Sequence, residues 1–122
     1  MRYLMLVCVD PDVTDADRAT APDIDDWLDD LADVRVMGNE LQALRTARTV
    51  RVRDGQTLVT DGPYTESKEW IAGFDILEVP DLEAAIKVAA AHPMAYGGRI
   101  EVRPFAEVEA TASQRPQDKE PR

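Results

Sequence analysis

The hydrophobic pattern at the start of the chain predicts a strand followed by a helix. Residues 2–9 are apolar at both alternating positions, which is typical of a strand covered on two sides. Thr20 is then a candidate helix cap, with Pro22 in the first turn and apolar residues at helical spacing over 24–34. Aspartates occupy the opposite side of that helix. The pattern therefore predicts a surface helix with one apolar face.

The segments 49–53 and 56–60 carry the clearest local signal. Both are rich in β-branched residues, and Asp54-Gly55 between them supplies the glycine that a two-residue turn requires. The chain therefore predicts a β-hairpin. In that register the cross-strand partners are Val52 with Thr57 and Val50 with Val59.

The second half repeats the order of strand, helix and strand. Residues 70–79 predict a strand, Asp81 caps a helix, and residues 99–104 predict a final strand. Pro93 disfavours helix at His92. The apolar stripe expected on this second helix consists of Leu82, Ala85, Ile86 and Ala89.

With a short extended segment at 37–41, these elements predict an α+β fold. The expected architecture is a ferredoxin-like β-α-β-(hairpin)-β-α-β antiparallel sheet with two helices on one face. The other face needs cover that one chain of this length does not supply, so we expect a homodimer. Residues 1–106 form the expected domain, and residues 107–122 are polar, aperiodic and expected to be disordered.

Charge and composition narrow the function classes. The chain has 122 residues and a net charge of −10, and ten aspartates with one arginine fall within residues 10–33. Such an acidic face disfavours nucleic acid and anionic membranes as partners. Its simplest interpretation is a solvated helix face, and the alternative is a docking surface for a basic partner. An EF-hand is excluded, because Asp15 stands where glycine is needed and Ala21 where glutamate is needed.

The cysteine, histidine and glycine positions exclude several chemistries. Cys8 is the single cysteine and His92 the single histidine, so no tetrahedral zinc set exists, and no glycine-rich turn for a nucleotide phosphate is present. We therefore expect no metal and no cofactor. A lone cysteine and the lack of a cleavable leader or long apolar span favour a cytoplasmic location.

Asp61 and His92 are the candidate catalytic pair. Asp61 ends a strand beside a glycine, where it either caps the turn or acts as a general base at a cleft. His92 follows a helix C-terminus, whose dipole favours the protonated imidazole, so it either meets free carbonyls or acts as an acid.

Four further side chains are candidate substrate ligands. Taken singly, each is more simply a salt bridge or a packing residue, but around one cleft they would hold a small anionic or phenolic ligand. They are Tyr64, Glu69, Tyr96 and Arg103. Of the two tryptophans, Trp27 belongs to the expected core, whereas Trp70 covers either the pocket or a dimer contact.

Three blocks of the chain resemble the DGPF branch of the YCII-related family. The first is residues 3–7. The second consists of residues 49–54, residues 59–64 with the motif Asp61-Gly62-Pro63-Tyr64, and residues 66–69 followed by Gly73-Phe74. The third is residues 97–104, and the resemblance covers about residues 1–105. Tyr64 replaces the phenylalanine of the family motif. The resemblance implies a ferredoxin-like fold that pairs into a dimeric α/β barrel with an enclosed cleft.

The same resemblance implies two classes of function. Relatives include dehydrochlorinase, isomerase and monooxygenase-like proteins, which favours a cofactor-independent lyase or isomerase. Some DGPF proteins are linked to extracytoplasmic-function sigma factors, which favours a regulatory or ligand-sensing module instead. Relatives with a proposed site pair a histidine near the first helix with an acidic residue before a proline. Here residues 21–24 lack the histidine, and His92 itself precedes Pro93.

Overall fold

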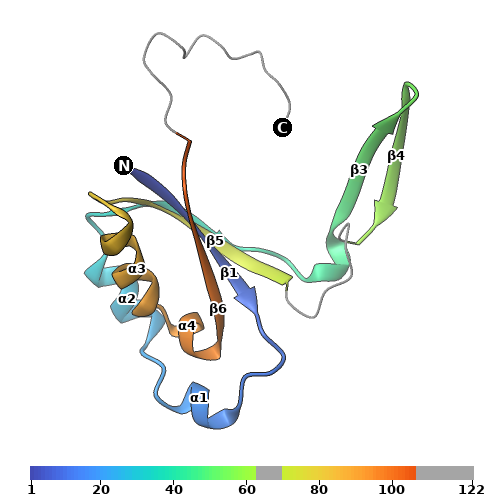
Figure 1. Ribbon diagram of the computed structural model, residues 1–122. Helices are drawn as coiled ribbons and strands as arrows, with labels where there is room; N and C mark the ends of the chain where they lie inside the picture. Colours follow the sequence, from blue (N-terminus) through green and yellow to red (C-terminus); the bar gives the residue numbers. More distant parts are fainter. Residues whose placement is uncertain (63–69, 107–122) are drawn as a thin grey trace, which may run out of the picture.

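The computed structural model describes residues 1–62 and 70–106 and has an antiparallel four-stranded sheet at its centre (Figure 1). The strands are β1 (Arg2–Val9), β2 (Arg35–Glu40), β5 (Trp70–Glu78) and β6 (Gly98–Pro104). They are ordered β2-β5-β1-β6, and each neighbouring pair is antiparallel. The predicted α+β class and the predicted antiparallel pairing are therefore confirmed.

The helices lie on one side of this sheet (Figure 1). They are α1 (Asp15–Ala19), α2 (Ile24–Asp30), α3 (Leu82–Ala90) and α4 (Pro93–Gly97). The two longer helices, α2 and α3, are the ones that the hydrophobic pattern predicted. The five-residue helices α1 and α4 were missed, because such short helices contain too few turns to show a period.

The cap predicted for the first helix is wrong. Asp23, and not Thr20, caps α2, because its side chain accepts a hydrogen bond from the backbone N–H of Asp25 at 2.7 Å. Thr20 instead ends α1, whose own cap is Thr14 in a reciprocal capping box with Asp17. The sequence therefore contains two helix starts where we expected one.

The main core lies between the sheet and the helices. It is formed by Tyr3, Met5, Trp27, Leu77, Val79, Ala85 and Ala89. The stripe predicted for α3 is half wrong, because Ala85 and Ala89 are buried whereas Leu82 and Ile86 are exposed. The helix is rotated so that its small residues approach the sheet.

The opposite face of the sheet, called here the open face, is also apolar but only half-buried. Because side chains alternate along a strand, the residues between the core positions point to this face. They include Leu4 and Leu6 of β1 with Phe74 and Ile76 of β5, which pair across the ladder. Cover on both sides of the first strand, which the sequence predicted, is therefore not found within the described chain, because helices cover only one side.

A separate two-stranded sheet projects from the body on the side of the open face (Figure 1). It consists of β3 (Arg48–Arg53) and β4 (Gln56–Asp61) and follows the 3-10 turn η1 (Leu44–Thr46). The register is the predicted one, with Val50 opposite Val59 and Val52 opposite Thr57. Asp54 and Gly55 have φ of 52° and 76°, the positive values that this turn needs.

Within the described part of the chain, no helix is both long enough and apolar enough to cross a membrane. The segment 107–122, predicted to be disordered, lies outside the described residues.

Candidate functional site

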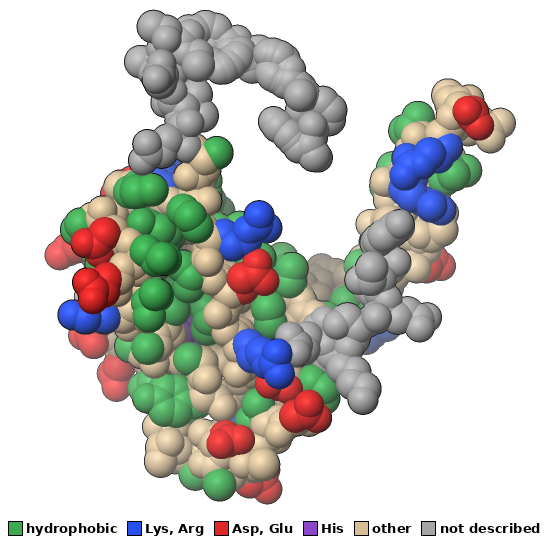
Figure 2. Space-filling view, in the orientation of Figure 1, with side chains coloured by type: hydrophobic (Ala, Val, Ile, Leu, Met, Phe, Trp, Pro, Cys, Tyr) green, Lys and Arg blue, Asp and Glu red, His purple; other side chains and the backbone are tan. Residues whose placement is uncertain are grey.

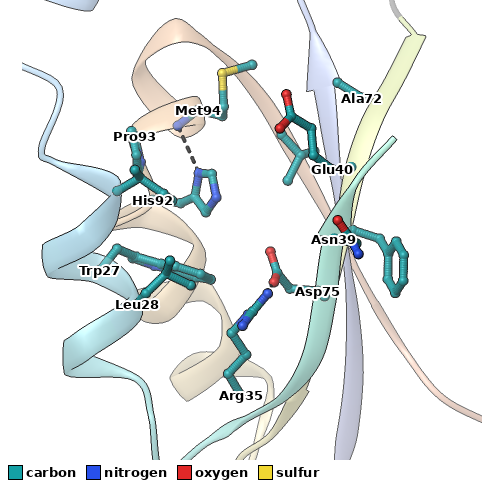
Figure 3. Close-up of a pocket in the computed structure, with 15 residues that line it drawn as sticks. Trp27, Leu28, Arg35, Asn39, Glu40, Ala72, Asp75, His92, Pro93 and Met94 are labelled. Atoms are coloured by element: carbon teal, nitrogen blue, oxygen red, sulfur yellow. Dashed lines mark hydrogen bonds and ion pairs between the residues drawn. The ribbon is translucent and has the colours of Figure 1, made fainter. Parts of the chain in front are cut away.

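A cavity of about 650 Å³ lies on the helix side of the sheet, between α2, the strands β2 and β5, and the start of α4 (Figure 3). Its apolar lining includes Val7, Ile24, Trp27, Leu28 and Met94. Its polar lining includes Arg35, Glu40, Asp75 and His92. A mostly apolar cavity with a few polar groups is typical of a small-molecule site.

His92 is the polar group with the most informative geometry. It is only 6% exposed and stands directly before α4, where its Nδ1 accepts the backbone N–H of Met94 at 2.9 Å. An acceptor nitrogen carries no proton, so the neutral imidazole holds its proton on Nε2. Figure 3 shows that edge of the ring facing the cavity, toward Asp75. Among the described residues no group is hydrogen-bonded to Nε2.

Burial lowers the pKa of His92 below its ordinary value of 6.5. The negative charge of Asp75 acts in the opposite direction, and the positive charge of Arg35 lowers the pKa further. The expectation that a helix dipole favours the protonated form is therefore wrong. His92 lies beyond the end of α3, and its ring packs edge-on against Trp27 with the centroids 4.5 Å apart, so desolvation is the larger effect.

Asp75 places a carboxylate on the strand wall of the cavity. It is 6% exposed, and its Oδ1 accepts a hydrogen bond from Nε of Arg35 at 2.6 Å. The two residues lie on neighbouring strands, β5 and β2. A buried carboxylate needs such a partner, because an unpaired charge is costly to desolvate. The arginine therefore keeps a charged oxygen inside an otherwise apolar cavity.

Gly38 provides the space that Asp75 occupies. It lies opposite Asp75 in the β2–β5 ladder, and a Cβ on Gly38 would collide with Oδ1 of Asp75 and with the carbonyl oxygen of Phe74. Only a residue without a side chain lets the carboxylate lie against this strand.

Trp27 forms the helix wall of the cavity and is fixed in place. Its side chain is 3% exposed, and its Nε1 donates a hydrogen bond to the carbonyl oxygen of Val88 at 3.0 Å. This bond links α2 to α3 and holds the indole against His92. Trp27 is therefore a core residue, as predicted, and also a wall of the cavity.

Asp61 and His92 do not meet within the chain. Asp61 ends β4, with its side chain 89% exposed and 3.2 Å from Nε of Arg48. It does not line the cavity that contains His92. The buried carboxylate that faces His92 across the cavity is Asp75, from a different strand.

The other predicted ligands are scattered. Tyr96 lines a second, shallower hollow beside Asp10 and Arg99. Arg103 is exposed on β6, 3.9 Å from Glu101. Tyr64 and Glu69 lie outside the described residues. Of the site residues predicted from the sequence and described in the structure, only His92 lines the main cavity.

Asp75 and Arg35 were missed, although the sequence holds one signal for Asp75. It is the single charged residue in the middle of an apolar strand, Trp70 to Leu77. A charge at such a position is either paired or functional. Arg35 gives no such signal, because it is the first residue of β2, and a charged residue at the start of a strand is common.

The fold and this cavity define a small α+β protein with a partly polar pocket of small-molecule size, whose lining includes the buried side chains of Asp75 and His92. The model of the YCII-related domain matches residues 1–109. The chain therefore belongs to the YCII-related family.

One curated relative is a protein of Rhizobium meliloti (strain 1021), named only as uncharacterised. It is 39% identical over 64 residues, which make up 49% of this chain and 50% of the relative. The matched segment thus spans about half of the relative's length, and its name assigns no activity.

Proposed function

We propose that this protein binds a small molecule with a ring-sized apolar body and an acceptor oxygen, and that it catalyses a cofactor-independent proton transfer of the lyase or isomerase type. The observation that carries this proposal is the Nδ1 bond of His92 to the Met94 N–H, which leaves Nε2–H as the donor facing the cavity. The apolar body would contact Trp27 and Leu28, which line the same space.

A neutral imidazole N–H is well suited to polarise a carbonyl oxygen. Buried in an apolar cavity, a fixed donor stabilises charge that develops on oxygen more strongly than water does. The lowered pKa keeps the imidazole neutral, so no charge must be removed when a ligand enters.

Asp75 is the proposed base. Its carboxylate would take a proton from the carbon next to the carbonyl group, and the electron pair of that C–H bond would pass to the carbonyl oxygen, which Nε2–H of His92 stabilises. In an isomerase the carbonyl group re-forms as Asp75 returns the proton to a different carbon. In a lyase the carbonyl group re-forms, a C=C bond forms, and the leaving group on the next carbon departs with the electron pair of its own bond and takes the proton from Asp75. Arg35 holds Asp75 in position in either case.

We propose the working unit to be a homodimer. In this proposal two ferredoxin-like sheets face each other through their open faces and form a dimeric α/β barrel. The support is the half-buried apolar face of β1 and β5, which no helix of the described chain covers. Two such faces would bury each other.

A matched pair of ligands tests the binding claim. Acetophenone and ethylbenzene differ by the carbonyl oxygen, and binding of each can be followed by Trp27 fluorescence in a Trp70→Phe background. We expect the parent to bind acetophenone about tenfold more tightly, the value of one good hydrogen bond. His92→Phe should remove this preference while keeping the aromatic packing. Equal affinities in the parent would contradict the proposal.

Deuterium exchange tests the catalytic claim. The methyl protons of acetophenone should exchange with D2O faster in the presence of the parent than in the presence of Asp75→Asn, as followed by proton NMR. Asp61→Asn is the control and should exchange like the parent. If all three exchange alike, Asp75 is not a base for this ligand class and only the binding claim stands.

A second candidate function is a regulatory module that meets a basic partner, for which a sigma factor is one candidate. The observation in its favour is the exposed acidic side of α2. Within residues 1–62 and 70–106 its aspartates form no ion pair: Asp25, Asp26, Asp29 and Asp30. This function predicts binding that salt weakens, and that neutralising these four residues weakens, while Asp75→Asn has no effect on it.

A further inference from the structure

The β3–β4 hairpin carries exposed apolar side chains. Val50, Val52 and Val59 are 61%, 58% and 58% exposed. Within the described part of the chain, no helix or strand packs extensively against either strand of the hairpin. A two-stranded hairpin alone in water is marginally stable at best. We therefore expect a further packing contact to stabilise the extended hairpin.

The valines lie together on one face of the hairpin. Residues directly opposite each other in an antiparallel ladder share a face, so Val50 and Val59 lie side by side, with Val52 and its partner Thr57 next to them. Arg51 and Arg53 alternate with these residues and point to the other face. The hairpin thus has a valine face and an opposite face, which carries Arg51 and Arg53 together with Leu58.

We infer that the hairpin is an intersubunit arm, whose valine face packs against a second copy of this chain. Figure 1 places the arm on the same side of the sheet as the open face, which is the surface proposed above for dimer contact. Figure 2 shows open space between the body and the arm. A copy seated on the open face would lie next to the arm and cover its valines.

Charge complementarity also favours a second copy. Residues 48–61 contain three arginines and two aspartates, whereas the whole chain has a net charge of −10. A weakly basic arm on a strongly acidic protein is attracted to the body of another such protein. This inference adds a separate contact to the proposed dimer, and it does not depend on what the cavity binds.

Two glutamate substitutions at adjacent positions test the arm. Val59→Glu places a charge on the valine face, and Thr60→Glu places the same charge on the opposite face, so any long-range charge effect is matched. Sedimentation measurements of the dimer dissociation constant should show an increase of about tenfold or more for Val59→Glu, as expected when a buried valine is lost. Thr60→Glu should change it less than about threefold. Equal effects of the two substitutions would overturn the inference.

Hydrogen exchange gives a second readout that a misfolded variant cannot imitate. In the parent, the cross-strand amides of residues 48–61 should be protected at concentrations above the dimer dissociation constant and should exchange rapidly below it. Protection that is independent of concentration would overturn the inference, because the hairpin would then be stable without a partner.

A substitution on the open face distinguishes the arm contact from the proposed sheet-to-sheet dimer. Leu6→Glu on the open face should dissociate the proposed sheet-to-sheet dimer. If the parent dimerises and Leu6→Glu raises the dimer dissociation constant but Val59→Glu does not, the sheet dimer stands and the intersubunit role of the arm is refuted. If the parent is monomeric at all concentrations, both the sheet dimer and the arm contact are refuted. Binding of acetophenone in the cavity is measured independently of dimerisation.

Discussion

The body of the protein and its hairpin arm both contain antiparallel strands joined by backbone hydrogen bonds, but the side chains of the two regions have very different environments. In the body, Met5 of β1 and Leu77 of β5 are fully buried beneath the helices. In the arm, every residue of β4 is exposed. The ladder of the arm is regular nonetheless, with six consecutive residue pairs. Local sequence is thus enough to set a hairpin's register, whereas a cavity requires side chains from distant segments.

The two regions should also differ in how much each side chain contributes to the stability of the protein. The cavity wall brings together Trp27, Asp75 and His92 from three parts of the chain, so a change at any of them affects the body as a whole. Among the described residues, the two strands of the arm contact mainly each other. Substitutions in the two regions should therefore have effects of very different size.

The largest effect is expected at Trp27. Trp27→Ala removes a 3% exposed indole and its hydrogen bond to Val88, which should lower the free energy of unfolding by about 3–5 kcal/mol. Urea unfolding followed by circular dichroism measures this change. Val52→Ala, on the arm, is the comparison and should cost far less at a protein concentration where the chain is monomeric. Similar losses in the two variants would contradict the distinction between body and arm.

An intermediate effect is expected at Gly38. In Gly38→Ala the added methyl group would displace Asp75 and strain the neighbouring strand, at a cost of about 1–3 kcal/mol. Gly97→Ala is the matched control, because its methyl group would meet neighbours only at ordinary contact distance, 3.8 Å. Thermal unfolding of both variants compares them. An unchanged melting temperature for Gly38→Ala would show that Asp75 is free to move away.

A smaller effect is expected from the titration of His92. Its folded-state pKa is lowered, so the unfolded chain binds the proton more readily than the folded chain. The contribution of His92 to stability is therefore complete above the unfolded pKa of 6.5 and is lost as the pH falls below that value toward the folded pKa. We expect this contribution to be smaller than the effect of Gly38→Ala.

His92→Gln provides the control for that pH dependence, because it retains the carboxylates, which also titrate in acid. Subtracting its stability profile from that of the parent isolates the histidine. A difference profile that rises as the pH falls from 7 to 5 would mean that the folded protein favours the charged imidazole, which contradicts the structure.

The smallest effect is expected at Asp61. Its ion pair with Arg48 is largely exposed, and such pairs contribute little to stability. Asp61→Asn should therefore leave both unfolding and the titration of His92 unchanged. A shift of the His92 pKa in this variant would show that the arm brings Asp61 to a cavity, either within one chain or across a dimer.

The sequence predicted those parts of the fold that depend on local patterns. The hairpin register, the strand limits near Arg2 and Pro104, and the Asp81 cap all follow from residues within a few positions of each other. The helix cap at Asp23 was missed because Thr20 offers an equally good cap sequence, and only packing decides between them.

The site could be predicted only in part. His92 was identified because it is the single histidine, but its partner was sought at Asp61, in a recognisable motif, and the structure places Asp75 opposite it instead. The His92 pKa was predicted in the wrong direction, because the dipole of α3 is a local property, whereas burial against Trp27 depends on a helix over sixty positions away in the sequence.

His92 is proposed to be a neutral Nε2–H donor in the cavity, and nitrogen NMR of the protein labelled with ¹⁵N-histidine shows which ring nitrogen carries the proton. A single histidine gives two ring nitrogen signals, whose couplings to the ring protons identify the protonated nitrogen. We expect a proton on Nε2, a pKa of His92 below 6.5, and a higher pKa in Arg35→Met, where a nearby positive charge is removed. A proton on Nδ1, or a pKa above 6.5 in the parent, would contradict the proposed role of His92.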